Sequence, residues 1–180
     1  MVSNRKRLEK GLIQVYFGRG KGKTTAAIGQ AVRATGHGFK VYMIQFMKGN
    51  YKYGEIEAIK AISNFELKQF GSPELIAEPG DFDKDQGEKA IQFAREIIMS
   101  DDYDIVILDE VGVAISMNVI PVDPIIDLIK KKPEKVELIL TGGPKMHPKI
   151  KELADLITEM KMIKHYYSSQ GLTARYGIEY

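Results

Sequence analysis

The sequence contains no cysteine, which excludes disulfides, thiolate catalysis and cysteine-ligated zinc sites. No run of residues approaches the ~20 consecutive apolar residues that span a bilayer, so we expect no membrane association. The opening residues, MVSNRKRLEKG, are charged and lack the apolar stretch of a secretory signal, which leads us to expect a cytoplasmic protein. Neither sign of charge dominates, because 26 basic side chains oppose 24 acidic ones, and we therefore expect no nucleic-acid partner.

The composition that remains is that of an ordinary globular domain. Its 180 residues suffice for one domain with a single substantial core, and 44% of them are apolar and 28% charged. Two basic clusters, residues 5–7 and 130–132, are expected to be solvated ends of the chain and of a helix rather than a polyanion site. We expect a short charged N-terminal segment, residues 1–10, followed by one domain over residues 11–180.

Short apolar runs alternate with amphipathic segments, which is typical of parallel strands joined by helices. The segment DIVILDE is the most apolar and is expected to lie centrally, whereas FELKQF is expected at an edge. Asp123 is the expected cap of its helix. The pattern predicts strands at 12–17, 40–46, 65–70, 104–110, 136–143 and 156–167, and helices at 24–35, 54–62, 84–99, 123–131 and 148–155. The predicted fold is an α/β domain with a mostly parallel sheet flanked by helices.

The stretch GRGKGKTTAA, residues 18–27, nearly fits the phosphate-binding pattern G-x-x-x-x-G-K-[ST]. It is one residue short, since Phe17 stands where the first glycine is usual. Glycines let backbone amides approach an anion, and the helix that follows adds its positive end. A lysine neutralises charge and a hydroxyl helps to hold magnesium. A glycine-rich turn without a ligand is the alternative, but the predicted strand before the loop and the helix after it favour nucleotide binding.

The strand IVILDE delivers Asp109 and Glu110 to its carboxyl end and resembles a Walker B strand. In open α/β sheets ligands bind at that edge. Carboxylates there can hold Mg²⁺ directly or through water. The alternative is an acidic pair at the surface after a core strand.

Five segments in order carry a wider resemblance: VYFGRGKGKTTAAIGQAVRATGHGFKV, IQFMKGNYKYGE, YDIVILDE, LILTGG, and LADLITEMKMIKH with ARYGIEY. Together they resemble the P-loop-type corrinoid adenosyltransferases, also called cob(I)yrinic acid a,c-diamide adenosyltransferases, from about residue 11 to the end. The shortened loop is itself a feature of that family. The resemblance implies a single P-loop NTPase-like (RecA-like) domain.

The resemblance also implies a reaction. Family members transfer the 5′-deoxyadenosyl group of ATP to the Co(I) of a reduced corrinoid and release triphosphate, in adenosylcobalamin biosynthesis or salvage. ATP is the co-substrate, Mg²⁺ the cofactor and the corrinoid the substrate. Because the cobalt is the nucleophile, the protein needs no activated serine, cysteine or lysine. The family further suggests a homodimer and a flavodoxin-like reductant.

The family's motifs assign roles to particular residues. Lys23 would contact phosphate, Thr24 would bind Mg²⁺, and Glu110 would be the second magnesium ligand with Asp109 close by; Lys23, Thr24 and Glu110 are thus the expected catalytic residues. The expected ATP-binding residues are Gly18, Arg19, Gly20, Lys21, Gly22, Lys23, Thr24, Thr25, Lys48 and Glu55.

Two departures from the family pattern bear on activity. Gly143 stands where many members have the arginine of a TGR motif, a role that Lys145 could fill. The best known bacterial members carry a Phe-x-Trp segment in a middle loop, but this chain has no tryptophan and only Phe82 as an aromatic there. A P-loop ATPase or phosphotransferase, and a non-catalytic ATP-binding module, remain as alternatives.

Overall fold

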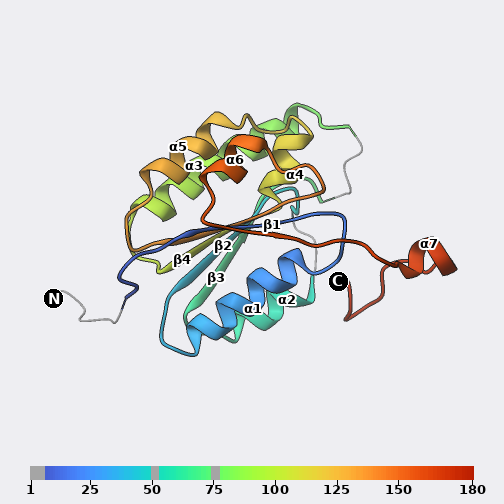
Figure 1. The fold of residues 1–180 in the computed structure, drawn as a ribbon, viewed down its shortest axis with the longest axis horizontal. Coiled ribbons are helices and arrows are strands. Elements are labelled where there is room, and N and C mark those ends of the chain that lie inside the picture. Colours follow the sequence, from blue (N-terminus) through green and yellow to red (C-terminus); the bar gives the residue numbers. More distant parts are fainter. Residues whose placement is uncertain (1–6, 50–52, 74–77) are drawn as a thin grey trace.

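A computed structural model describes residues 7–49, 53–73 and 78–180. Its centre is a six-stranded sheet with strand order β3-β2-β4-β5-β1-β6, and all five strand pairings are parallel (Figure 1). The strands are β1 Ile13–Phe17, β2 Val41–Gln45, β3 Phe65–Gln69, β4 Ile105–Asp109, β5 Glu137–Thr141 and β6 Leu156–Glu159. The central position of β4 and the edge position of β3 are confirmed.

The helices form a layer on each face of the sheet (Figure 1). One face carries α1 (Lys23–Thr35) and α2 (Gly54–Lys60), and the other carries α3 (Asp81–Met99), α4 (Val111–Ser116), α5 (Asp123–Lys131) and α6 (Pro148–Leu153). Each face has its own apolar core, because strands buried on both sides point alternate side chains into the two layers. The P-loop NTPase-like (RecA-like) architecture expected from the sequence is confirmed.

Strand register determines which side chains meet at the carboxyl edge of the sheet. Gln45 at the end of β2 is level with Asp109 at the end of β4. Tyr16 near the end of β1 is level with Thr141 at the end of β5. Since β5 lies between β1 and β4, the loop after β1 and the acidic end of β4 face each other across the end of β5.

Four predictions about individual elements are wrong. The last strand ends at Glu159 rather than residue 167, and a further short helix, α7 (Tyr166–Gln170), follows it. Helix α4 was not predicted, because six residues directly after a core strand, all but the last without a polar side chain, carry no helical period of their own. Helix α3 begins at Asp81, so Phe82 lies in its first turn and not in a loop. Asp123 does not cap α5, because Val122 occupies the cap position and Asp123 is already helical.

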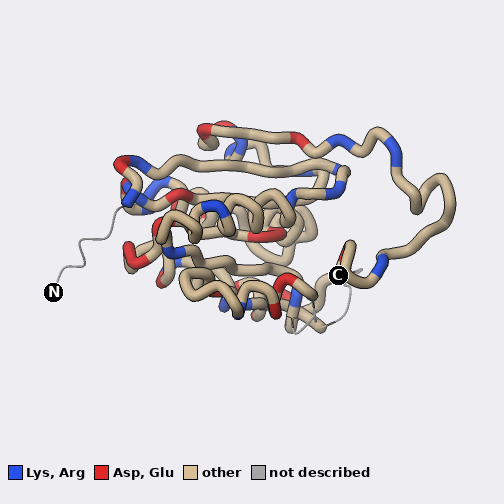
Figure 2. Tube along the Cα trace, turned by 90° about the horizontal axis from the view of Figure 1, so that it is seen from below, with Lys and Arg blue, Asp and Glu red and all other residues tan. Residues whose placement is uncertain are grey.

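Basic and acidic residues are interspersed along the described chain, without a continuous basic stripe (Figure 2). None of the helices in the described ranges is long and apolar enough to cross a membrane.

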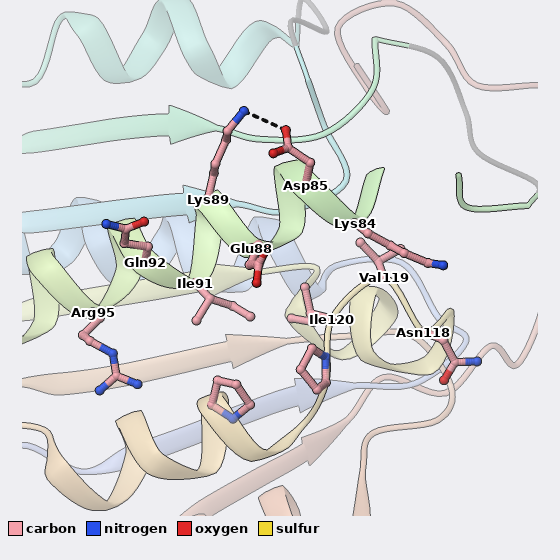
Figure 3. A pocket seen from close by; sticks show the side chains of 12 residues that line it. Lys84, Asp85, Glu88, Lys89, Ile91, Gln92, Arg95, Asn118, Val119 and Ile120 are labelled. Atoms are coloured by element: carbon pink, nitrogen blue, oxygen red, sulfur yellow. Dashed lines mark hydrogen bonds and ion pairs between the residues drawn. The ribbon is translucent and has the colours of Figure 1, made fainter. Parts of the chain in front are cut away.

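An open groove lies between α3 and α5 (Figure 3). Its volume is about 980 Å³. Ile91, Val119 and Ile120 contribute apolar side chains to it, and the ion pair between Lys89 and Asp85, with an N–O distance of 2.7 Å, lies among its lining residues.

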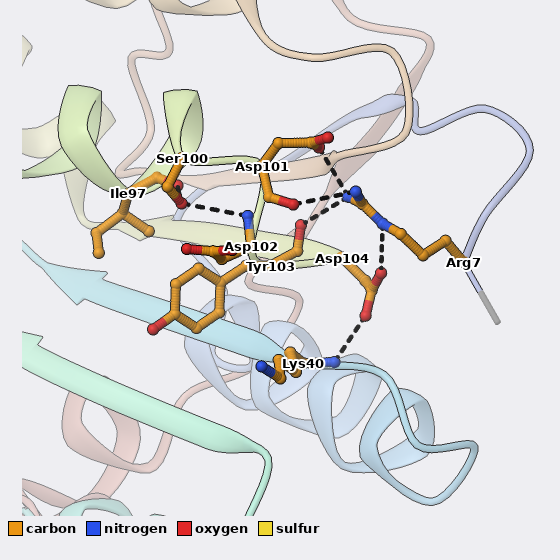
Figure 4. A network of polar contacts seen from close by, with 8 residues as sticks. All are labelled: Arg7, Lys40, Ile97, Ser100, Asp101, Asp102, Tyr103 and Asp104. Atoms are coloured by element: carbon orange, nitrogen blue, oxygen red, sulfur yellow. Dashed lines mark hydrogen bonds and ion pairs between the residues drawn. The ribbon is translucent and has the colours of Figure 1, made fainter. Parts of the chain in front are cut away.

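The start of the described chain is held at the amino edge of the sheet (Figure 4). Arg7 Nε donates to Asp104 Oδ1 at 3.0 Å, and Arg7 Nη2 donates to Asp101 Oδ1 at 2.9 Å. Asp104 is fully buried, and its second oxygen accepts the backbone amide of Lys40 at 2.8 Å. Arg7 is therefore not the solvated residue that the sequence suggested, while Arg5 and Lys6 lie outside the described residues.

Two lysines of the second basic cluster, residues 130–132, also form contacts, whereas the sequence suggested that they are solvated. Lys132 Nζ donates to the carbonyl of Gly11 at 2.7 Å, and burial lowers the pKa of this lysine. Lys131 forms an ion pair with Asp127 at 2.7 Å. These lysines stabilise the end of α5 and the entry into β1.

Candidate active site

The loop between β1 and α1, residues 18–22, has a backbone that only glycine adopts easily. Gly18 and Gly22 have φ of 119° and 115°, in the region that side chains disfavour. The amide of Gly18 donates to Gly143 O at 3.1 Å, and that of Gly20 donates to Met160 O at 2.7 Å. A Cβ added at Gly18 would lie 2.4 Å from Met160 O. The loop is thus wedged between the segments that follow β5 and β6, and its curvature depends on glycine.

This loop has the properties of an anion site. Helix α1 begins at Lys23, so the amides of its first turn have no carbonyl of the helix to which they can donate. Those amides and the positive end of the helix dipole favour a negative ligand. Lys23 Nζ donates to Gly20 O at 2.8 Å, which folds the lysine back over the loop. The loop therefore has the backbone and charge that an anion site requires.

Beneath the loop, the carboxylate of Asp109 connects four elements. Asp109 is fully buried. Its Oδ1 accepts the hydroxyls of Thr24 at 2.8 Å and Thr141 at 2.7 Å. Its Oδ2 accepts Gln45 Nε2 at 3.2 Å and Lys48 Nζ at 2.9 Å. Because a carboxylate has about four acceptor positions, these donors use its capacity. Asp109 thus orients Thr24 and Lys48 and leaves little capacity for direct contact with a metal ion.

Glu110 is placed differently from its neighbour. It has a left-handed backbone, with φ of 61°, and its amide donates to the hydroxyl of Thr141 at 2.8 Å. Its carboxylate lines a cavity and accepts no hydrogen bond from the residues that the structure describes. Burial, and then the charge of Asp109, raise its pKa, while Lys48 and Lys23 oppose the shift. A half-buried carboxylate that lines a cavity in this way is suited to a cation.

Lys48 is held between a carboxylate and an aromatic ring. Its side chain is 12% exposed, and its Nζ lies 4.9 Å from the centroid of the Tyr53 ring. Burial lowers the pKa of Lys48, but attraction to Asp109, with smaller contributions from Glu110 and Glu55, raises it above the ordinary value. Lys48 therefore brings a fixed positive charge to the cavity.

The cavity itself has a volume of about 520 Å³. Most of the predicted site residues meet there: Lys21, Gly22, Lys23, Thr24, Thr25, Lys48, Glu55 and Glu110. Gly18, Arg19 and Gly20 belong to the loop but do not line the cavity, and Asp109 lies below it. The α3–α5 groove of Figure 3 is larger but has no glycine loop among its lining residues, so the smaller cavity is the candidate active site.

Several lining residues had no role in the sequence analysis. Ile28 and the chain end, Gly177, Ile178, Glu179 and Tyr180, contribute to the cavity wall. The segment ARYGIEY belongs to the family resemblance, and this resemblance is the signal in the sequence that could have placed the chain end at the site. Tyr53 lines the cavity beside Lys48, whereas Tyr51 and Lys52 lie outside the described residues.

The missing arginine would have been next to the phosphate loop. Gly143 O accepts the amide of Gly18, which places position 143 beside the start of the loop. Lys145 is exposed and does not line the cavity, so the structure gives no support to its taking over that role.

Comparison with known proteins shows the family of the chain. The family described as ATP:corrinoid adenosyltransferase BtuR/CobO/CobP matches residues 9–180. The chain is 33% identical to a corrinoid adenosyltransferase of Escherichia coli K12, over 96% of this chain and 87% of that protein. It is 36% identical to a corrinoid adenosyltransferase of a Sinorhizobium species, over 96% of this chain and 81% of that protein.

Solved structures show the same fold at lower identity. The flagellar accessory protein FlaH from Methanocaldococcus jannaschii superimposes with a TM-score of 0.58 at 16% identity, covering 84% of this chain and 72% of FlaH. The genome packaging NTPase B204 of Sulfolobus turreted icosahedral virus 2, in complex with ATP-gammaS, superimposes with a TM-score of 0.50 at 17% identity. The match covers 83% of this chain and 74% of B204. The fold is thus that of the P-loop NTPases, and the sequence match over almost the whole chain shows that it belongs to the ATP:corrinoid adenosyltransferase family, enzymes that transfer the adenosyl group of ATP to a corrinoid.

Proposed function

We propose that the 520 Å³ cavity binds Mg·ATP and presents the ribose C5′ to the Co(I) of a reduced corrinoid. An electron pair of Co(I) forms the cobalt–carbon bond as the C5′–O bond breaks, and the electron pair of that bond leaves with inorganic triphosphate. The cobalt is formally oxidised to Co(III), so the electron balance requires no further reactant in this step. The observation that carries the proposal is a phosphate loop facing a half-buried carboxylate, Glu110, that has no hydrogen-bond donor among the described residues, in a chain of this family.

The phosphate loop would hold the triphosphate and stabilise its departure. Lys23 is the residue that would leave its contact with Gly20 O and bind phosphate oxygens. Lys21 lies at the cavity wall and Arg19 on the exposed side of the loop, where both add positive charge. Charge held in place at the leaving group lowers the barrier for its departure, and no protein nucleophile is needed.

Thr24 and Glu110 fit a magnesium site. The Thr24 hydroxyl donates a hydrogen bond to Asp109, so its lone pairs are available to a cation. The half-buried Glu110 carboxylate lines the same cavity, without a donor among the described residues. Mg²⁺ favours such oxygen ligands together with phosphate and water, and it would neutralise charge on the triphosphate. Asp109 would act by orienting Thr24, and direct ligation by Asp109 is not part of this proposal.

Lys48 and Glu55 would bind ATP at the other wall of the cavity. Asp109 holds the Lys48 ammonium in place, and Gln45 Nε2 lies 3.5 Å from Glu55 Oε1. Contacts with the edge of the sheet therefore hold both side chains in place before the substrate binds. Less side-chain entropy is then lost when ATP binds.

A homodimer, a flavodoxin-like reductant and a cytoplasmic location are proposed with this function. The homodimer is supported by the edge strand β6, where Leu156 and Ile157 are each 44% exposed and a second copy could cover them. Light scattering of the purified chain would give the mass of a dimer, and a monomer at all concentrations would contradict this part.

The reaction is tested by its products. A chemically reduced corrinoid with Mg·ATP is expected to give a light-sensitive alkylated corrinoid and one equivalent of inorganic triphosphate. Stoichiometric ADP without a cobalt–carbon bond would overturn the proposal in favour of an ATPase or phosphotransferase. ATP binding without either product would indicate a non-catalytic module. The glycine at position 143 is expected to slow turnover, and each tenfold loss corresponds to about 1.4 kcal/mol of barrier.

A further inference from the structure

The last fifteen residues, 166–180, form a C-terminal hook (Figure 1). After β6 the chain leaves the body of the domain, forms α7 and turns back, so that its end lies at the phosphate loop. Helix α7 has no buried residue, so the hook does not depend on the apolar core for its position. Its tip, residues 177–180, nevertheless lines the candidate active site, and Lys21 Nζ donates to Ile178 O at 3.1 Å.

A cluster of three side chains, Tyr166, Arg175 and Glu179, closes the hook on itself. The Glu179 carboxylate accepts a short hydrogen bond from the Tyr166 hydroxyl. It also accepts the Arg175 amide at 2.7 Å, Nε at 3.3 Å and Nη2 at 3.2 Å. The Arg175 guanidinium lies 4.7 Å from the centroid of the Tyr166 ring. The two ends of the hook are thereby joined through one carboxylate.

The same cluster fixes the direction of the tip. Gly177 has a left-handed backbone, with φ of 74°, and its amide donates to Tyr180 O at 2.7 Å. The amide of Ile178 donates to Arg175 O at 3.2 Å. Chain ends without such ties are usually poorly ordered. The hydrogen bonds of Arg175, and then that of Tyr166, hold the pKa of Glu179 at about 2, so the carboxylate that joins the cluster is ionised at neutral pH.

We infer that Tyr166 and Arg175 are positioning residues, which hold residues 177–180 as one wall of the nucleoside triphosphate pocket. This inference rests on the proposed placement of ATP in the cavity. Because residues 177–180 are already ordered in the ligand-free protein, ATP binding does not have to order them. The conformational entropy that binding would otherwise lose is retained, and the affinity for ATP is higher. The wall also holds Lys21 at the mouth of the loop through Ile178 O. Neither positioning residue lines the cavity, so their effect on the reacting atoms is indirect.

Two variants of the full chain test the inference. Arg175→Leu and Tyr166→Phe are each expected to raise the ATP dissociation constant in calorimetry by about tenfold, because the tip must then be ordered on binding. The KM for ATP should rise in parallel, with kcat at saturating ATP changed less than about twofold, the signature of lost uniform binding. The unfolding temperature should not change, because the hook has no buried helix residue. Arg175→Lys, which keeps the charge, is expected to restore part of the affinity.

Tyr167→Phe is the matched control. Tyr167 is the neighbouring residue on the same helix, the residue is 62% exposed, and its side chain is not part of the cluster. ATP affinity should be unchanged by this substitution. Unchanged affinity in both Arg175→Leu and Tyr166→Phe would overturn the inference, and so would tighter binding, which would make the hook an obstruction. Failure of the proposed function looks different: the wild-type chain would then bind no Mg·ATP, or Lys23→Ala would bind it equally well.

Discussion

Replacing Asp109 by asparagine should destabilise the domain strongly even in the absence of ATP. The carboxylate is fully buried and receives four donors, and the ammonium of Lys48, 12% exposed, is one of them. The asparagine side chain has nearly the same size but only one accepting oxygen. Its NH₂ group would face the donors that bind the other oxygen of Asp109. The substitution therefore leaves the Lys48 charge buried without its counter-charge.

Breaking a buried ion pair by removing one partner costs about 3–5 kcal/mol. For a chain of this size each kcal/mol corresponds to roughly 2–4 °C in unfolding temperature, so Asp109→Asn should lower it by roughly 6–20 °C. The assay is thermal and urea unfolding of the ligand-free protein. The double variant Asp109→Asn with Lys48→Met should recover part of the loss, because the unpaired ammonium is then gone.

The chain offers a control that differs in burial. The ion pair of Lys60 and Glu57 is 2.7 Å long, but its side chains are 65% and 76% exposed. Glu57→Gln should therefore cost less than about 1 kcal/mol, since water screens that pair. If Asp109→Asn were as mild as Glu57→Gln, and showed no coupling to Lys48→Met, the buried network could not be what holds Thr24 and Lys48 in place.

Three further predictions concern the phosphate loop, the metal ion and the hook. Lys23→Ala should remove most ATP affinity in calorimetry without a change in folding, because the hydrogen bond that its ammonium donates among the described residues goes to the loop carbonyl of Gly20 and not to the core; unchanged affinity would reject the loop. Glu110→Gln should raise the Mg²⁺ concentration needed for activity and stabilise the ligand-free protein by about 1 kcal/mol, because a partly desolvated charge repelled by Asp109 is removed; an unaltered magnesium titration would contradict the assignment. The folded-state pKa of Glu179 is depressed from 4.5 to about 2, so its contribution to the hook is complete above about pH 4.5 and lost as the pH falls toward 2; NMR signals of Gly177 should shift only in that window, and a shift near neutral pH would contradict this.

The centre of the sheet could be predicted from the sequence because β2, β4 and β5 are buried on both faces. Such strands are continuous apolar runs, and β4 is the clearest, with every residue buried. The phosphate loop could also be predicted, because its glycines, lysine and threonine are adjacent in the chain. In both cases the physical requirement acts on neighbouring residues, so the local sequence displays it.

The Asp109 network could not be predicted in this way. Its partners Thr24 and Lys48 are 85 and 61 residues away in the chain. They meet because parallel register makes the ends of β2, β4 and β5 level, and register depends on the whole sheet. The sequence alone therefore paired Asp109 with the magnesium ion, whereas the structure pairs it with Thr24, Thr141, Gln45 and Lys48.

The hook escaped prediction for the opposite reason. Residues 166–180 show no apolar period, because α7 buries none of its residues and periodicity reports burial. What orders the hook is a polar cluster, in which Tyr166 and Glu179 are 13 residues apart. Neither residue type has a spacing that signals such a contact.

The position of the hook's tip has a consequence for joining this domain to other polypeptides. Tyr180 lines the cavity, so an affinity tag or a fused domain attached after it would emerge at the rim of the site and compete with ATP for space. Arg7, in contrast, is bound at the amino edge of the sheet (Figure 4), whereas the phosphate loop follows the carboxyl end of β1. A domain fused ahead of residue 7 should leave the access of ATP to the cavity unchanged. The amino edge is therefore the better place to attach a fused domain.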